Sequence, residues 1–425
     1  MTEGASVKNS LPAHRGVVIV GGGQAGLAMA ATLQASGVDS IVLEKHRIAH
    51  HWRTQRWDSF CLVTPNWQCR LPGFPYDGPD PKGFMPRDEI VGYIERFAAV
   101  AGADIREGVA ATRLARDPAG GFTVETTAGT ISADAVVLAV SAYHVPNIPR
   151  LAERLPEAIM QLHSSAYRNP AQLPPGAVLV VGTGQSGCQI AEDLHLAGRQ
   201  VHLAVGSAPR SPRVYRGRDA VEWLSDLGQY DMPVERHPLR EQVRRKSNHY
   251  LTGRDGGRDI DLRRFAAEGM ALHGRLRDIA AGQLHFADDL AANLDAADRS
   301  YNGICDLIDR HIAEHGIAAP PGVHYTPVWR PGPHGPSLDP AAAGITGIVW
   351  GTGFRSDWSW VDLPIFDGTG YPTHRRGVTS LPGVYVLGLP WLNSWGSGRF
   401  EAVGRDAAYI GERIAAAMPA RAMAG

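Results

Sequence analysis

The sequence predicts an α/β fold with two Rossmann-like domains, the second inserted in the first. An apolar run leads into a glycine-rich turn and a helix-like stretch, the same order returns later in the chain, and each copy is followed by another apolar run. The two copies occupy residues 17–20, 21–26, 27–35 and 40–43, and residues 178–181, 182–187, 188–197 and 201–205. This order is typical of a βαβ unit with a parallel sheet.

The patterns after the second unit indicate that the first domain resumes near the C-terminus. Short apolar runs at 348–350 and 384–387 and a helical stretch at 401–418 return to the order of strand and helix. We therefore expect a flexible tail, a first domain in two segments, and a second domain with a helical elaboration. The expected boundaries are 1–16 for the tail, 17–150 and 345–425 for the first domain, 151–344 for the second, and about 219–315 for the elaboration.

Composition excludes several classes of protein. The 425 residues include 42 Lys and Arg against 43 Asp and Glu, so the net charge of −1 gives no field that attracts nucleic acid. The 4 cysteines form no C-x-x-C pair, which is typical of a reduced intracellular chain. No apolar run approaches the roughly 18 residues that span a bilayer, and the N-terminus lacks the apolar segment of a secretory signal. We expect a cytoplasmic protein with no membrane and no nucleic-acid partner.

Each glycine hexad follows an apolar strand and opens a helix, which is the context in which G-x-G-x-x-G binds a dinucleotide. The first glycine permits the turn, the second lets the backbone approach the pyrophosphate, and the third lets the helix pack on the strand. The helix N-terminus supplies N–H groups to the phosphates. The predicted contacts are Gly21, Gly23, Gln24, Ala25 and Gly26 in the first hexad and Gly182, Gly184, Gln185, Ser186 and Gly187 in the second.

The residues that follow each unit predict two different dinucleotides. Glu44 ends the second strand of the first unit, where a carboxylate accepts hydrogen bonds from a ribose 2′-hydroxyl, as in FAD or NAD. The same position after the second hexad is Val205, and no acid follows it, whereas Arg210 and Arg213 do. Arginine without a carboxylate suits a 2′-phosphate, so we expect NADPH in the second domain and FAD in the first.

At this point the chain resembles the group B flavin-containing monooxygenases, in the bacterial single-component branch akin to the plant auxin-forming flavin monooxygenases. Besides the hexads, the matching stretches are residues 51–53, 56–58, 62–66, 71–73, 83–89, 351–354 and 383–389. The family fingerprint F-x-G-x-x-x-H-x-x-x-Y/W is half present: His163 and Tyr167 fill its last slots, whereas Glu157 and Ile159 stand in place of phenylalanine and glycine. In having tyrosine and not tryptophan in the last slot, the chain resembles the heteroatom-oxidising members of the family more than the Baeyer–Villiger members.

The resemblance implies an activity. NADPH reduces the flavin, O₂ adds to form a C4a-(hydro)peroxyflavin, and one oxygen passes to a small organic substrate by N- or S-oxidation. It also implies that Asn66 lies near the peroxide, that Trp52 and Arg53 cradle the flavin, and that Trp391 and Trp395 face the ring or line the substrate pocket. Lys45, Val109 and Gly388 complete the expected cofactor contacts.

Several alternatives stay open. An NADPH oxidase or reductase, a Baeyer–Villiger or decarboxylating monooxygenase and a non-enzymatic redox sensor would share the same two nucleotide sites, and a homodimer also stays open. A thioredoxin-reductase-like relay needs the C-x-x-C pair that this chain lacks. The stretch 311–315 matches the zinc pattern H-x-x-E-H, but its place at a predicted helix end before Gly316 favours an ordinary helix terminus, so we expect no metal.

Overall fold

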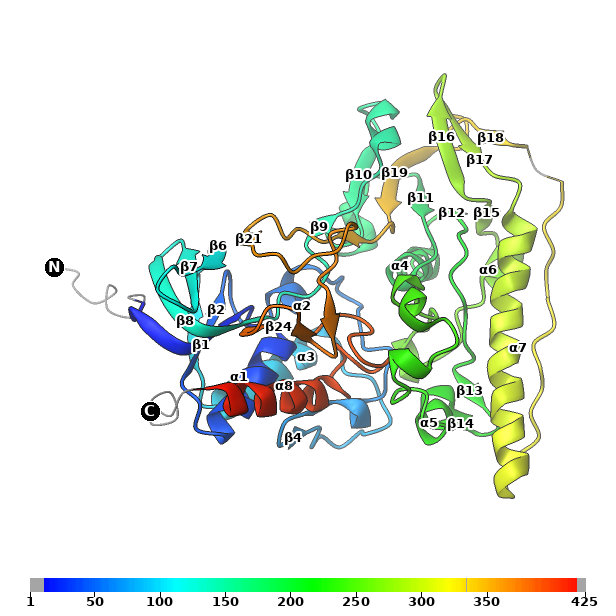
Figure 1. Cartoon of the computed structure of the whole chain (residues 1–425). Coiled ribbons are helices and arrows are strands. Elements are labelled where there is room, and N and C mark those ends of the chain that lie inside the picture. Colours follow the sequence, from blue (N-terminus) through cyan, green and yellow to red (C-terminus); the bar gives the residue numbers. More distant parts are fainter. Residues whose placement is uncertain (1–10, 334, 419–425) are drawn as a thin grey trace.

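The computed structural model describes residues 11–333 and 335–418, and it contains two α/β domains built on separate sheets (Figure 1). The predicted fold class is confirmed. Of the expected tail, residues 1–10 lie outside the described residues. The rest of that prediction is wrong in part, because β1 (His14–Val20) begins inside the expected tail and pairs from His14 onward with β8 (Gly129–Leu138).

The first domain has a ten-stranded sheet whose centre is parallel. Its main path runs β21-β6-β7-β8-β1-β2-β5, and β24 pairs with residues 136–138 of β8, beyond the part of β8 that pairs with β7. The other strands of this sheet are β2 (Ser40–Glu44), β5 (Asp104–Glu107), β6 (Ala111–Arg116), β7 (Phe122–Thr126), β21 (Val361–Asp362), β22 (His374–Arg375), β23 (Val378–Thr379) and β24 (Val384–Val386). Helices α1 (Gln24–Ala35) and α8 (Val403–Ala417) pack against each other, although nearly the whole chain separates them.

Shorter elements and helix α3 complete the first domain. They are α2 (His50–Thr54), the 3-10 helix Asn66–Gln68, β3 (Arg70–Leu71), β4 (Phe74–Pro75), α3 (Arg87–Val100), and β9 (Val145–Pro146), which pairs with β20 (Phe354–Arg355). The central strands are continuous apolar runs because both of their faces are covered. Val17, Val18 and Ile19 are all 0% exposed.

The second domain has a five-stranded parallel sheet in the order β10-β19-β11-β12-β15. Its strands are β10 (Met160–His163), β11 (Ala177–Val181), β12 (Val201–Ala204), β15 (Ala271–His273) and β19 (Ile345–Trp350), and α4 (Gln185–Leu196) connects β11 to β12. The expected boundary at residue 345 is therefore wrong. Strand β19 fills the gap between β10 and β11 in the second sheet, so the chain returns to the first domain only after Trp350.

The elaboration mixes helices with strands, whereas the sequence patterns indicated helices. Its helices are α5 (Ala220–Asp226), α6 (Leu262–Ala267) and α7 (Leu290–His315), with 3-10 turns at Val234–Arg236, Arg240–Arg245 and Arg254–Gly256, and it contains the hairpin of β16 (Leu276–Ala280) and β17 (Gln283–Phe286). Strands β13 (Val214–Tyr215), β14 (Arg218–Asp219) and β18 (Ser337–Leu338) lie next to it in the sequence. Helix α7 and the extended segment that follows it form the side of the second domain that lies away from the first (Figure 1). Among the described helices, none combines the length and the apolar character needed to cross a membrane.

Candidate active site

The first glycine hexad makes the turn between β1 and α1. Gly21 has a φ of +108°, and a Cβ there would lie 2.6 Å from the carbonyl oxygen of Ala139. A Cβ on Gly26 would lie 1.8 Å from the Gly21 carbonyl oxygen, so glycine alone lets α1 pack this closely. A Cβ on Gly23, by contrast, would meet no atom within 4 Å. The second glycine therefore faces the open space through which a pyrophosphate approaches the backbone in this motif.

The second hexad repeats this geometry. Gly182 has a φ of +100°, and its Cβ would lie 2.8 Å from the carbonyl oxygen of Gly351. A Cβ on Gly187 would lie 2.0 Å from the Gly182 carbonyl oxygen, whereas a Cβ on Gly184 would again meet nothing within 4 Å. The two turns thus divide the same three roles among their glycines.

Helices α1 and α4 both begin without a side-chain cap. Gly23 and Gly184 are the N-cap residues, and neither offers a side chain to the N–H groups of the first turn. These N–H groups and the positive end of each helix dipole therefore remain for an anion in the open space. Both cradles fit a dinucleotide pyrophosphate, as expected for FAD at α1 and NADPH at α4.

Glu44 lies where the first domain would bind an adenosine ribose. Its carboxylate accepts hydrogen bonds from the backbone N–H groups of Gly22 and His46, each at 2.8 Å, which fixes its orientation at the end of β2. The Glu44 carbonyl accepts from the N–H of Val109, a fully buried residue, and Lys45 is exposed beside it. A carboxylate held in this way has lone pairs left for ribose hydroxyls.

Gln24 joins the first hexad to the loop before α8, residues 391–398, which we call the C-terminal loop. The Gln24 side chain donates to the carbonyl of Gly398 at 2.9 Å and accepts from the indole N–H of Trp52 at 3.3 Å. Gly388, at a φ of +79°, lies so close to α1 that a Cβ there would be 2.6 Å from Ala25 Cβ. The structure therefore brings together four of the residues predicted to contact the flavin.

Arg53 was expected to cradle the flavin with Trp52. Its guanidinium instead forms an ion pair with Glu95 of α3. Trp52 lies in a cluster of rings and stacks on Phe400, with centroids 5.8 Å apart. The geometry thus leaves Trp52 close to Gln24 and the C-terminal loop, and it turns Arg53 toward α3.

The C-terminal loop carries a stack of aromatic rings that spans the two domains. Trp395 is stacked on Tyr230 of the elaboration, with centroids 4.8 Å apart and planes at 9°, and Trp391 lies nearly parallel to Trp395 at 6.3 Å. Two backbone hydrogen bonds fasten the same contact, from Gly396 N–H to the Tyr230 carbonyl and from Val234 N–H to the Asn393 carbonyl. The elaboration thus covers the loop, a role that sequence patterns gave no sign of.

Asp406, which was not among the predicted site residues, holds the C-terminal loop in place through Ser397. It lies in the first turn of α8, is 3% exposed, and hydrogen-bonds with Ser397, whose hydroxyl oxygen accepts the N–H groups of Asn393 and Ser394 at 3.1 Å. Burial raises the pKa of Asp406 to about 6. An acidic residue in a first helical turn was the available signal, but its burial depends on packing that sequence does not show.

Asn66 has a structural role in this conformation. It is 3% exposed, its amide N–H donates to the Asp80 carbonyl at 2.9 Å, and its amide oxygen accepts from Met85 N–H at 2.7 Å. These bonds tie the 3-10 helix at Asn66–Gln68 to residues 80–85. The predicted hydrogen bond from Asn66 to an oxygen adduct would have to use its remaining amide N–H.

Arg210 and Arg213 are buried and paired with carboxylates, so the structure does not support their assignment to a 2′-phosphate. The side chain of Arg210 is 3% exposed, pairs with Asp261 and Asp298, and lies over two tyrosine rings. The side chain of Arg213 is 2% exposed, pairs with Asp219 at 2.6 Å, and donates to the Val63 carbonyl at 2.7 Å. Distant carboxylates pair with Arg210 and the nearby Asp219 pairs with Arg213, and Arg213 also joins the second domain to the first.

The second hexad is held to the elaboration through Gln185. Its amide oxygen accepts from Leu251 N–H at 3.2 Å, and its amide N–H donates to the Leu251 carbonyl. The neighbouring Ser186 lies in the first turn of α4, beside the open space at Gly184. The side chain of Gln185 is therefore occupied, and its backbone N–H remains for a phosphate.

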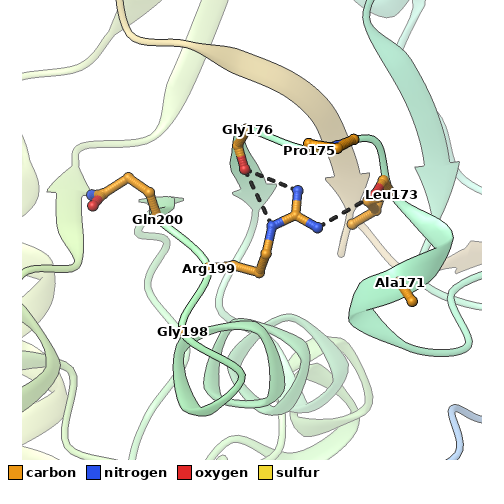
Figure 2. Close-up of a pocket in the computed structure, with 7 residues that line it drawn as sticks. All are labelled: Ala171, Leu173, Pro175, Gly176, Gly198, Arg199 and Gln200. Carbon is orange, nitrogen blue, oxygen red and sulfur yellow. Dashed lines mark hydrogen bonds between the residues drawn. The ribbon is translucent and has the colours of Figure 1, made fainter.

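A surface hollow in the second domain lies at the amino ends of β11 and β12, opposite the end of the sheet that carries the glycine hexad. Figure 2 shows Arg199 in this hollow, between Gly176 and Leu173. Its guanidinium donates to the carbonyls of Leu173, Pro174 and Gly176, so its charge caps the loop before β11. Ligands of open α/β sheets bind outside the carboxyl ends of the strands, where the hexads lie.

The comparisons with known proteins agree with this geometry. A family model described as pyridine nucleotide-disulphide oxidoreductase matches residues 18–227. An uncharacterized oxidoreductase, CzcO-like, of Geobacillus kaustophilus is 31% identical over 398 residues, or 93% of this chain and 96% of that protein. Indole-3-pyruvate monooxygenase YUCCA1 of Oryza sativa subsp. japonica is 35% identical over 193 residues, or 45% of this chain and 47% of that protein.

A solved structure shows the same fold. A flavin-containing monooxygenase from Stenotrophomonas maltophilia superposes with a TM-score of 0.65 at 18% sequence identity, covering 95% of this chain and 99% of that one. The predicted family is confirmed by a relative aligned over nearly the whole chain, together with two hexads of matching geometry. The chain belongs to the CzcO-like oxidoreductase family, and it is similar to the flavin monooxygenases, as the expected group B relationship implies.

Proposed function

We propose that this protein is an NADPH- and O₂-dependent flavoprotein monooxygenase that transfers one oxygen atom to nitrogen or sulfur of a small organic substrate. The observation that carries the proposal is the pair of glycine cradles, one of which is linked through Gln24 to an aromatic loop covered by the other domain. A bound flavin would supply the redox and oxygen chemistry, and the chain supplies position and exclusion of water.

Named residues carry the positioning in this proposal. Gly23 and the first turn of α1 hold the FAD pyrophosphate, and Glu44 holds the adenosine ribose. Gly184 and the first turn of α4 hold the pyrophosphate of NADPH. The C-terminal loop, fixed by Asp406 and covered by Tyr230, shields the ring from water with Trp391 and Trp395.

The cysteines favour oxygenation over disulfide reduction, the activity that the name of the matching family model describes. Cys61, Cys69, Cys188 and Cys305 are all buried and free. Burial raises the pKa of every one, to about 11 for Cys61 and about 12 for Cys69 and Cys305. A dithiol relay needs accessible, low-pKa cysteines in a pair, and these residues have the opposite properties.

The test is a balance of NADPH, O₂ and product. The holoenzyme is supplied with NADPH, isotopically labelled O₂ and a panel of small amines and sulfides, and H₂O₂ is measured in parallel. We expect at least one compound to gain one labelled oxygen while H₂O₂ release falls. If all the O₂ consumed appears as H₂O₂ with every compound, the protein is an oxidase and the proposal is wrong.

A further inference from the structure

Asp193 joins three separate parts of the chain at one buried carboxylate. It lies on α4, the helix that opens at the second hexad, and is 5% exposed. One oxygen accepts from the Ser59 hydroxyl at 2.6 Å and from the Arg254 guanidinium at 2.7 Å. The other oxygen accepts from the Tyr167 hydroxyl at 2.7 Å.

The three donors come from different structural units. Ser59 belongs to the first domain, Tyr167 to the segment between β10 and β11 of the second domain, and Arg254 to the elaboration. Tyr167 is 0% exposed, and it is the residue in the last slot of the half-present fingerprint. The Asp193 carboxylate therefore holds α4 against the first domain through Ser59 and against the segment between β10 and β11 through Tyr167.

The neighbouring contacts show that the segment between β10 and β11 is held against the first domain and the second connection at several points. The imidazole of His163 hydrogen-bonds to the Gly353 carbonyl at 2.8 Å, beside the second connection between the domains. Asn169 donates to Asp58 at 2.7 Å, and Asp58 N–H donates to the Arg168 carbonyl at 2.8 Å. Asp193 differs from these contacts because it lies on the same helix whose N-terminus faces the open space at Gly184.

We propose that Asp193 is a positioning residue that sets the placement of the bound nicotinamide nucleotide relative to the flavin. The inference rests on the proposed function, because it assumes NADPH at α4 and FAD at α1. A shift of α4 moves the pyrophosphate cradle with it, and the nicotinamide then moves away from the flavin. Hydride transfer depends steeply on such geometry, since a misplacement of about 1 Å can cost on the order of 100-fold in rate.

The mechanism predicts a split between rate and affinity. The nucleotide contacts of α4 are made by its first turn, about two turns away from Asp193, so they persist when the carboxylate is lost. Asp193→Ala is expected to lower the limiting rate of flavin reduction by NADPH by about 10-fold or more, while the Kd for NADPH changes less than about 3-fold. FAD content is expected to remain that of the wild type.

The experiment is rapid-mixing of the oxidised holoenzyme with NADPH without O₂, at several NADPH concentrations, which separates the reduction rate from the Kd. Tyr167→Phe and Ser59→Ala remove one donor each, and Ser59 is exposed, so these variants decide the question if Asp193→Ala does not fold. Tyr215→Phe is the matched control. It removes a tyrosine hydroxyl that donates at the same 2.7 Å to Asp309, a carboxylate on α7 and not on α4.

The outcomes separate the two proposals. Slower reduction in Asp193→Ala, Tyr167→Phe and Ser59→Ala, with Tyr215→Phe at the wild-type rate, supports the positioning role. Wild-type reduction rates in the Tyr167 and Ser59 variants, or an equal loss in Tyr215→Phe, would overturn it. If NADPH reduces the wild-type flavin but no compound is oxygenated, the proposed function fails while the positioning role is still decided by the rates.

Discussion

At the scale of single residues, the candidate site depends on buried charged groups. Asp406 shows this most directly. Its carboxylate is buried behind the C-terminal loop, one of its oxygens has no hydrogen-bond partner among the described residues, and its pKa is raised to about 6 from 3.8. The folded protein thus binds this proton more tightly than the unfolded chain does.

This shift predicts a pH dependence of stability. Between about pH 4 and pH 6 the unfolded chain ionises at Asp406 before the folded protein does, so the contribution of this group to stability falls as the pH rises through this range. Asp406→Asn keeps the shape without the charge. The free energy of unfolding of the variant, relative to that of the wild type, is expected to rise by up to roughly 3 kcal/mol as the pH rises from 4 to 7. Urea unfolding at each pH measures the difference, and a difference that is constant with pH would contradict the assignment.

Arg210 carries a second prediction at this scale. Its guanidinium forms ion pairs with the buried carboxylates of Asp261 and Asp298. Arg210→Met removes this positive charge and is expected to lower the free energy of unfolding by about 3–5 kcal/mol. The preference for NADPH over NADH is expected to stay unchanged, because the side chain is not available to a phosphate. Arg277→Met, at an exposed arginine of the same domain, is the control. A stable variant that has lost the coenzyme preference would restore the assignment that the geometry disfavours.

At the scale of elements, the strand–turn–helix units divide folding and binding among their glycines. Gly26 and Gly187 pack against backbone oxygens, whereas Gly23 and Gly184 face open space. The same residue type therefore has a structural role at one position and a binding role three residues before it.

Substitution by alanine is expected to separate these roles. Gly23→Ala keeps the thermal stability of the FAD-free protein but weakens FAD binding at least about 10-fold, because the methyl group enters the space for the pyrophosphate. Gly184→Ala is expected to weaken NADPH binding at least about 10-fold for the same reason and to leave FAD binding unchanged. Gly26→Ala forces a clash at 1.8 Å and is expected to lower the yield of folded protein. Circular dichroism and titration with FAD and NADPH check these results, and a Gly23→Ala protein that binds FAD normally would contradict the cradle.

The elements also show which predictions sequence could support. The two hexads are local patterns, so their turns and helices were predicted from adjacent residues. The boundary at 345 was wrong because β19 joins the second sheet between strands that lie far earlier in the chain. The burial of Arg210 and Arg213 could not be predicted because it depends on carboxylates of the elaboration, and Tyr230 was missed because its stacking partner Trp395 is distant in sequence.

At the scale of the whole molecule, the second domain and its elaboration close over the first from one side. The chain crosses between the sheets twice, near residues 150 and 350, and the aromatic stack, Arg213 and Asp193 join the domains elsewhere. A site that lies between domains and is covered by one of them can exclude water, which oxygen transfer from a flavin requires.

The reaction of the NADPH-reduced enzyme with O₂ tests the central claim most directly. The full absorption spectrum is followed after rapid mixing, with NADP⁺ still bound and without substrate. We expect a spectral species distinct from both reduced and oxidised flavin, which persists before the oxidised spectrum returns and disappears faster when an oxidisable amine or sulfide is added. A direct, single-step return to oxidised flavin with stoichiometric release of H₂O₂ would contradict the account and identify an NADPH oxidase.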